Sequence, residues 1–115
     1  MFKGIIIGRL TRDATLNEVN GRQVCNFDVA VRTDFKDASG QYITNFVKVA
    51  AWNGQAGPCS HLTKGQMVAV TGSIVEKDYK KRDGTDGHET NITASGVEFL
   101  TPKKDNGGAD LFEGN

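Results

Sequence analysis

Residues 45–52 read NFVKVAAW, and this stretch predicts both the fold class and the chemistry of the ligand. It is short, it is bounded by turn-forming residues, and its residue types favour β-strands. Because side chains alternate between the faces of a strand, one face carries three small apolar residues suited to a core: Val47, Val49 and Ala51. The other face carries two rings, a cation and an alanine: Phe46, Lys48, Ala50 and Trp52. Exposed rings beside a positive charge indicate a surface on which a flat anionic ligand such as nucleic acid stacks.

The composition is that of one globular domain. The chain has 115 residues, of which 24% are charged and 37% are hydrophobic, and these fractions suit a soluble protein with a single core. The first apolar run, residues 4–8, is too short for a signal peptide, and no segment has the length of a membrane span. We therefore expect a cytoplasmic protein with no membrane partner.

The net charge of zero divides unevenly along the chain. All 14 Lys and Arg residues lie at or before Lys104, whereas three of the 14 acidic residues follow it: Asp105, Asp110 and Glu113. Residues 1–104 therefore carry 14 positive and 11 negative charges, a net +3, and the tail carries −3. A basic domain with an acidic tail favours a polyanionic ligand.

The cysteines and histidines do not predict a metal site or a catalytic centre. Cys25 and Cys59 are far apart in the sequence and fit no metal-ligand spacing, so we expect two reduced packing residues. With His61 and His88 they would form a zinc site only by chance proximity. No GxSxG, HExxH or phosphate-binding glycine loop is present, so no cofactor or enzymatic activity is predicted. A small enzyme that uses His61 or His88 is kept as an alternative.

Hydrophobic alternation predicts five strand segments and one short helix. The strands are expected at residues 2–10 (with a weaker extension over 11–19), 22–33, 42–52, 66–79 and 88–100. Asn20-Gly21 predicts a tight hairpin, and Gly8 a close approach or a bend. Two strands have clear inward faces: Cys25, Phe27, Val29 and Val31 in one, Val68, Val70, Gly72 and Ile74 in the other. A helix is expected from Pro58 to Gly65, loops over 34–41 and 80–87, and a disordered tail after residue 102.

This order of elements excludes a parallel α/β sheet, because helices do not alternate with the strands. Five strands with one helix between the third and fourth predict an all-β fold, the five-stranded OB barrel, over residues 1–103. Residues 104–115 are expected to form a short acidic tail. Ligands of OB folds lie across the second and third strands and the flanking loops, and the loop over 34–41 and the third strand supply exposed rings there.

Four aromatic residues are the predicted stacking set: Phe35, Phe46, Trp52 and Tyr79. Lone rings in strands are more often core residues, but here Lys48 would be buried with the rings if they faced inward. Nine cations are candidate phosphate contacts: Lys3, Arg9, Arg32, Lys36, Lys48, Lys64, Lys77, Lys80 and Lys81. Strand parity sets Lys48 and Lys77 apart from the others, because it puts both beside the rings.

Five pieces of the sequence resemble, in order and spacing, the bacterial and phage single-stranded DNA-binding protein (SSB) family: GIIIGRLTRDATL, NGRQVCNFDVAV, FKDASGQYITNFVKVAAW, LTKGQMVAVTGSI and SGVEFLTPK. The resemblance spans residues 1–103, and it implies a location in the bacterial cytosol or nucleoid. It implies sequence-independent binding of single-stranded DNA in replication, recombination and repair, usually by a homotetramer, with a dimer left open. Its stacking positions fall on the same four rings, and its basic positions fall on Lys3, Lys36, Lys48, Lys64 and Lys77. An OB-fold replication-accessory module that binds protein or RNA is the alternative.

Three features depart from the family pattern. Fewer stacking positions hold tryptophan, which predicts a smaller stacking area. The helix region GQAGPCSHLTKG is one residue shorter than usual and is interrupted by Gly57-Pro58. The C-terminal GGADLFEGN lacks the family's terminal phenylalanine, so the resemblance implies recruitment of replication and repair proteins much less than DNA binding. A phage- or plasmid-encoded member, or a competence-type paralogue, fits this pattern.

Overall fold

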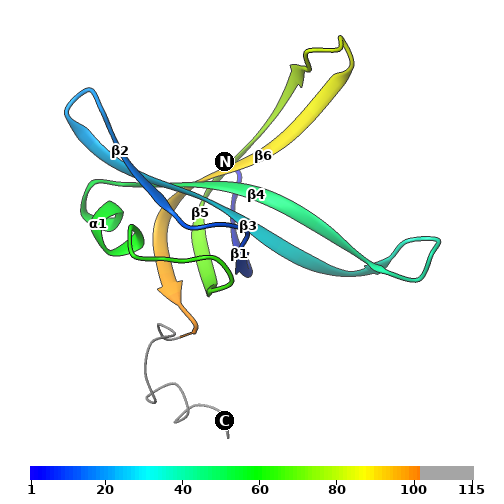
Figure 1. Ribbon diagram of the computed structural model, residues 1–115, viewed down its shortest axis with the longest axis horizontal. Coiled ribbons are helices and arrows are strands. Elements are labelled where there is room, and N and C mark those ends of the chain that lie inside the picture. The colour runs from blue at the N-terminus through cyan, green and yellow to red at the C-terminus, as the bar shows by residue number, and fades with distance from the viewer. Residues whose placement is uncertain (102–115) are drawn as a thin grey trace, which may run out of the picture.

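The computed structural model describes residues 1–101, and Figure 1 shows their arrangement. The tail predicted after residue 102 lies outside the described residues. Residues 1–101 form six strands: β1 (Lys3–Leu10), β2 (Thr15–Val19), β3 (Arg22–Lys36), β4 (Tyr42–Trp52), β5 (Met67–Lys80) and β6 (Asp86–Phe99). Between β4 and β5 lie a 3₁₀ turn, η1 (Asn53–Gln55), and one short helix, α1 (Ala56–Cys59). The predicted all-β class with a short helix at this place is confirmed.

Five of the strands close into a ring. The hydrogen-bonded order is β1-β5-β6-β4-β3, and β3 pairs back to β1 through Arg9 with Ala30 and Leu10 with Val29. Among the strand pairs of the described residues, only β4–β6 is parallel, with Val49 opposite Ile92; the other pairs are antiparallel. Strand β2 is attached to β3 outside the ring. Strands β3 and β4, and likewise β5 and β6, extend past the ring as long two-stranded arms (Figure 1).

The expected extension of the first strand over residues 11–19 is instead a separate strand. After Leu10 the chain leaves the β1 pairing. In this connecting segment, Thr11 N–H donates to the Asp28 carbonyl and Ala14 N–H donates to the Leu62 carbonyl. It re-enters the sheet as β2, a partner of β3. The predicted hairpin is confirmed: Asn20 (φ 52°) and Gly21 (φ 79°) are the two turn residues, and both adopt the positive φ that such a turn requires.

The two arms are longer than the sequence pattern predicted. Strand β3 continues through Lys36, so Phe35 lies in a strand end and not in a loop. A bulge between Arg32 and Lys36 accommodates this polar segment, and the Thr33 hydroxyl donates to the Ile43 carbonyl at 2.9 Å. The loop expected over 80–87 is likewise shorter, since β5 ends at Lys80 and β6 begins at Asp86. Cross-strand pairing sustains these segments, although their polar composition resembles that of loops.

The expected helix boundaries are wrong. The helix begins at Ala56 and ends at Cys59, instead of running from Pro58 to Gly65. Pro58 is its third residue, where the missing N–H costs no intrahelical bond. Ala56, Cys59 and Leu62 are buried against the ring, so tertiary packing sets the position of this short segment.

The core confirms the predicted inward faces. Val47, Val49 and Ala51 are at most 5% exposed. The inward residues of β3 and β5 are buried or partly buried as expected: Cys25, Phe27, Val29, Val31, Val68, Val70, Gly72 and Ile74. Gly8 lies where β1 crosses β3, and a side chain there would collide with the Ala30 carbonyl, which confirms the predicted close approach. Both cysteines are buried free thiols, as expected. None of the helices described over residues 1–101 is long and apolar enough to cross a membrane.

Candidate nucleic-acid interface

The outward face of β4 carries the two rings predicted there. Phe46 is 65% exposed, and the Lys48 side chain is 59% exposed, whereas Trp52 at the end of the strand is half-buried. This alternation with the buried valines follows from the period of the strand. The opposite face of β4 packs into the core, so Phe46 and Lys48 lie on the surface.

Two adjoining hollows lie on this face, and both are lined by Asp28 and Lys48. The first has a volume of about 500 Å³ and is lined by Trp52 together with Lys77 of β5. The second, about 340 Å³, is lined by Phe46 of β4 and Tyr79 of β5. We call the two together the groove. It brings three of the four predicted stacking residues and two of the predicted cations onto one surface.

Trp52 is held at one end of the groove by a neighbouring cation. The guanidinium carbon of Arg22, at the start of β3, lies 5.0 Å from the centroid of the Trp52 ring. The cation and the ring attract each other through the negative face of the indole. The β2–β3 hairpin fixes where Arg22 begins the strand, and so positions it against Trp52.

Phe35 does not line the groove. It lies on the β3–β4 arm, 73% exposed, next to Lys36. On the same arm, Arg32 Cζ and Lys36 Nζ lie 4.5 and 5.0 Å from the centroid of the Tyr42 ring. The arm therefore carries two predicted cations on one exposed ring, beside a second exposed ring.

The remaining predicted cations are spread over the surface. Lys80 pairs with Asp86 at 2.7 Å across the β5–β6 arm, and Lys81 lies in the loop of that arm. Arg9 donates to the Gly65 carbonyl at 2.9 Å. Lys3 and Lys64 are exposed. None of these five lines the groove, and their role as phosphate contacts stays a prediction.

Several residues of this surface were missed by sequence reasoning. Tyr42 could have been found, because it shares strand parity with Phe46 and Trp52. Arg22 could be placed beside Trp52 only once the register of the hairpin was known. Two ion pairs at the groove required the tertiary structure: Lys48 Nζ with Glu89 Oε1 at 3.5 Å, and Arg12 with Asp28 at 3.0 Å.

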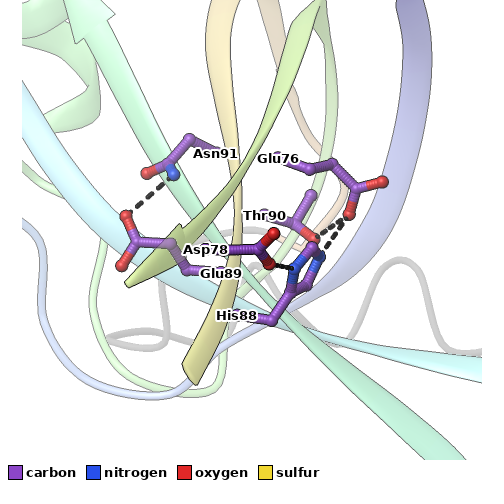
Figure 2. Close-up of polar contacts among 6 residues, drawn as sticks. All are labelled: Glu76, Asp78, His88, Glu89, Thr90 and Asn91. Atoms are coloured by element: carbon purple, nitrogen blue, oxygen red, sulfur yellow. Dashed lines mark hydrogen bonds and ion pairs between the residues drawn. The ribbon is translucent and has the colours of Figure 1, made fainter. Parts of the chain in front are cut away.

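A histidine is clamped by two carboxylates on the β5–β6 arm. Figure 2 shows His88 between Asp78 and Glu76, with Nδ1 2.8 Å from Asp78 Oδ1 and Nε2 2.9 Å from Glu76 Oε1. The hydrogen bond to Asp78, and then that to Glu76, raise the pKa of His88. The hydrogen bond from His88, and then that from Thr90, lower the pKa of Glu76. A carboxylate partner at each ring nitrogen favours the imidazolium form over the neutral one.

The candidate zinc ligands are not brought together. Within the part of the chain that the structure describes, no three His, Cys, Asp or Glu residues are grouped to hold a metal ion. His61 is exposed, while both cysteines are buried. The contacts of His88 are those of an ion-pair cluster.

The ring of strands has a solved counterpart. It superposes on the small single-stranded DNA-binding protein from Streptomyces coelicolor with a TM-score of 0.73 and 21% sequence identity, covering 85% of this chain and 93% of that one. The architecture is thus that of the OB fold, the class predicted from the strand order.

Residues 1–100 match the single-strand binding protein family, and the chain belongs to that family. It is 37% identical over 108 residues to single-stranded DNA-binding protein 2 of Clostridium acetobutylicum, covering 91% of this chain and 80% of the relative. It is 34% identical over 112 residues to the single-stranded DNA-binding protein of Oceanobacillus iheyensis, covering 96% and 70%. The match confirms the resemblance seen in the sequence. Proteins of this family are non-enzymatic DNA-binding proteins, so the alternative of a small enzyme is set aside.

Proposed function

We propose that this chain binds single-stranded DNA without sequence preference and protects it during replication, recombination and repair. The observation that carries the proposal is the groove, in which Phe46, Trp52 and Tyr79 surround Lys48. Aromatic side chains stack on any base, because every base has a π-face, and cations neutralise the phosphates. Duplex DNA hides those base faces, so single strands are preferred.

The β3–β4 arm extends the proposed path. Phe35 offers a fourth ring, and Arg32 and Lys36 offer positive charge beside Tyr42. The cations of the second arm, Lys80 and Lys81, contribute attraction that acts over a longer distance and is screened by salt.

We also propose that the protein acts as a homotetramer, with a dimer as the smaller assembly. Ile5 and Ile7 on β1 are 66% and 54% exposed, and an exposed apolar face of this kind supports contact with a second copy. Mass measured in solution, with and without oligo-dT of graded length, tests this assembly. A monomer at all lengths would contradict it.

The sole tryptophan makes the test of DNA binding direct. Titration with oligo-dT is expected to quench Trp52 fluorescence, and duplex DNA of equal length is expected to change it little. Filter binding with single-stranded DNA, single-stranded RNA and duplex distinguishes the proposal from an accessory module that binds RNA or protein. Unchanged emission at saturating oligo-dT would remove Trp52 from the site, and equal retention of RNA and DNA would favour the alternative.

A further inference from the structure

Glu89 of β6 lies between two cations of the groove. Its Oε1 is 3.5 Å from Lys48 Nζ of β4, and Lys77 is its direct cross-strand partner on β5. Directly opposed side chains in an antiparallel pair are near enough to interact. The Glu89 side chain is 25% exposed, less than half the exposure of Lys48, and it lines the groove beside the lysine.

A second carboxylate repeats this arrangement. Asp28 of β3 is the register partner of Lys48, and its carboxylate holds Arg12 at 3.0 Å. The cations of the β3–β4 arm differ: within residues 1–101, no carboxylate pairs with Arg32 or Lys36. The groove, where the rings lie, therefore has part of its positive charge already neutralised by the protein.

The contacts of Glu89 favour its ionised form. The Asn91 amide donates to its Oε2 at 2.9 Å and, with Lys48, lowers the pKa of the carboxyl group. A carboxylate held in this way is an anion at the place where a DNA phosphate would meet Lys48.

We propose that Glu89 is an internal competitor of the DNA phosphate: it occupies Lys48 in the free protein, and a phosphate must displace it. The inference rests on the proposed function and deepens it, because it names the residue that limits affinity at the groove. Binding then depends more on stacking than the number of groove cations suggests. It also depends less on salt, because salt weakens the competing ion pair together with the phosphate contact.

The test uses Glu89→Gln, which keeps the shape and the hydrogen bond to Asn91 and removes the charge. We expect the variant to bind oligo-dT severalfold more tightly at low salt, as measured by Trp52 fluorescence. We also expect the plot of log affinity against log salt concentration to be steeper by up to about 0.7. Glu98→Gln is the matched control, because Glu98 is an exposed carboxylate on the same strand that does not line the groove. Asp28→Asn, which releases Arg12, is expected to act in the same direction as Glu89→Gln.

A double-mutant cycle identifies the partner. The gain from Glu89→Gln is expected to disappear in a Lys48→Gln background, because the displaced cation is then absent. A gain no larger than that of Glu98→Gln, a gain that persists without Lys48, or weaker binding by Glu89→Gln would each overturn the inference. Wild-type protein that binds no oligo-dT would instead overturn the proposed function, so the two failures are distinguishable.

Discussion

Tyr79 and Gly87 are cross-strand partners on the β5–β6 arm, and the phenol ring occupies the space that a side chain at Gly87 would need. A Cβ at position 87 would lie 2.5 Å from Tyr79 Cζ and 2.7 Å from Cε2. Because Gly87 has no side chain, the Tyr79 ring can lie against the arm at this position, where it lines the groove with Phe46.

Gly87→Ala is expected to displace the Tyr79 ring and weaken oligo-dT binding, approaching the effect of Tyr79→Ala. Each stacked base contributes about 1–3 kcal/mol, so a loss within this range follows from moving one ring. Gly96→Ala is the control, because a Cβ at Gly96 on the same strand meets no atom within 4 Å. Equal affinities of the two glycine variants would show that the position of Tyr79 does not matter for binding.

Phe46→Ala is expected to weaken oligo-dT binding by about 1–3 kcal/mol while the melting temperature stays close to that of the wild type. The ring is 65% exposed, so its removal leaves no core cavity. Affinity and thermal unfolding measured on the same preparation separate the two effects. Phe2→Ala, which removes an exposed ring that does not line the groove, provides the comparison. A large loss of stability in Phe46→Ala would identify the ring as a packing residue.

Tyr42→Ala is expected to lower DNA affinity by about 1 kcal/mol or less, because the exposed ring holds Arg32 and Lys36 through cation–π contacts. Tyr42→Phe keeps the ring and is expected to bind like the wild type. The difference between the variants is measured with oligonucleotides long enough to reach from the groove to the arm. If Tyr42→Phe binds as weakly as Tyr42→Ala, the hydroxyl and not the ring is responsible.

His88 is expected to make stability depend on pH. Its pKa is raised in the folded protein, first by Asp78 and then by Glu76, so its contribution is complete below the unfolded pKa of about 6.5. The contribution is lost as the pH rises through the higher folded pKa. Glu76 has a lowered pKa, so its own protonation changes the stability of the protein only in the acid range.

The measurement is the difference in melting temperature between wild type and His88→Gln from about pH 6 to about pH 9, a range that spans the histidine titration. The wild-type advantage is expected to shrink with increasing pH. An advantage that is constant, or that grows, would contradict a protonated clamp on the arm.

The two cysteines are expected to be inert in the native protein. Burial raises the pKa of Cys25, and burial together with the nearby Cys25 thiol raises the pKa of Cys59 to about 11. The thiolate is the reactive form, so little of it exists at neutral pH. A chromogenic disulfide reagent should modify both thiols only after unfolding by denaturant. Rapid modification without denaturant would show that the core opens readily at these residues.

Much of the candidate site could be predicted because strand parity is local. The alternation over residues 45–52 separates Val47 and Val49 from Phe46 and Trp52 without any knowledge of the rest of the chain. Tyr79 and Lys77 could be assigned to one face of β5 by the same rule. Their roles in DNA binding remain proposals, but the surface on which they meet is the predicted one.

The sequence by itself determined the inward and outward faces, the Asn20-Gly21 hairpin and the order along the chain of the five strands that form the ring, because these depend on neighbouring residues and on turn chemistry. The tertiary structure alone decided the strand ends and the start of α1, because cross-strand pairing and burial outweigh local propensity there. It also decided which charges meet. Lys48 and Glu89 belong to strands far apart in the sequence, and they become neighbours only because the parallel β4–β6 contact joins those strands in the ring.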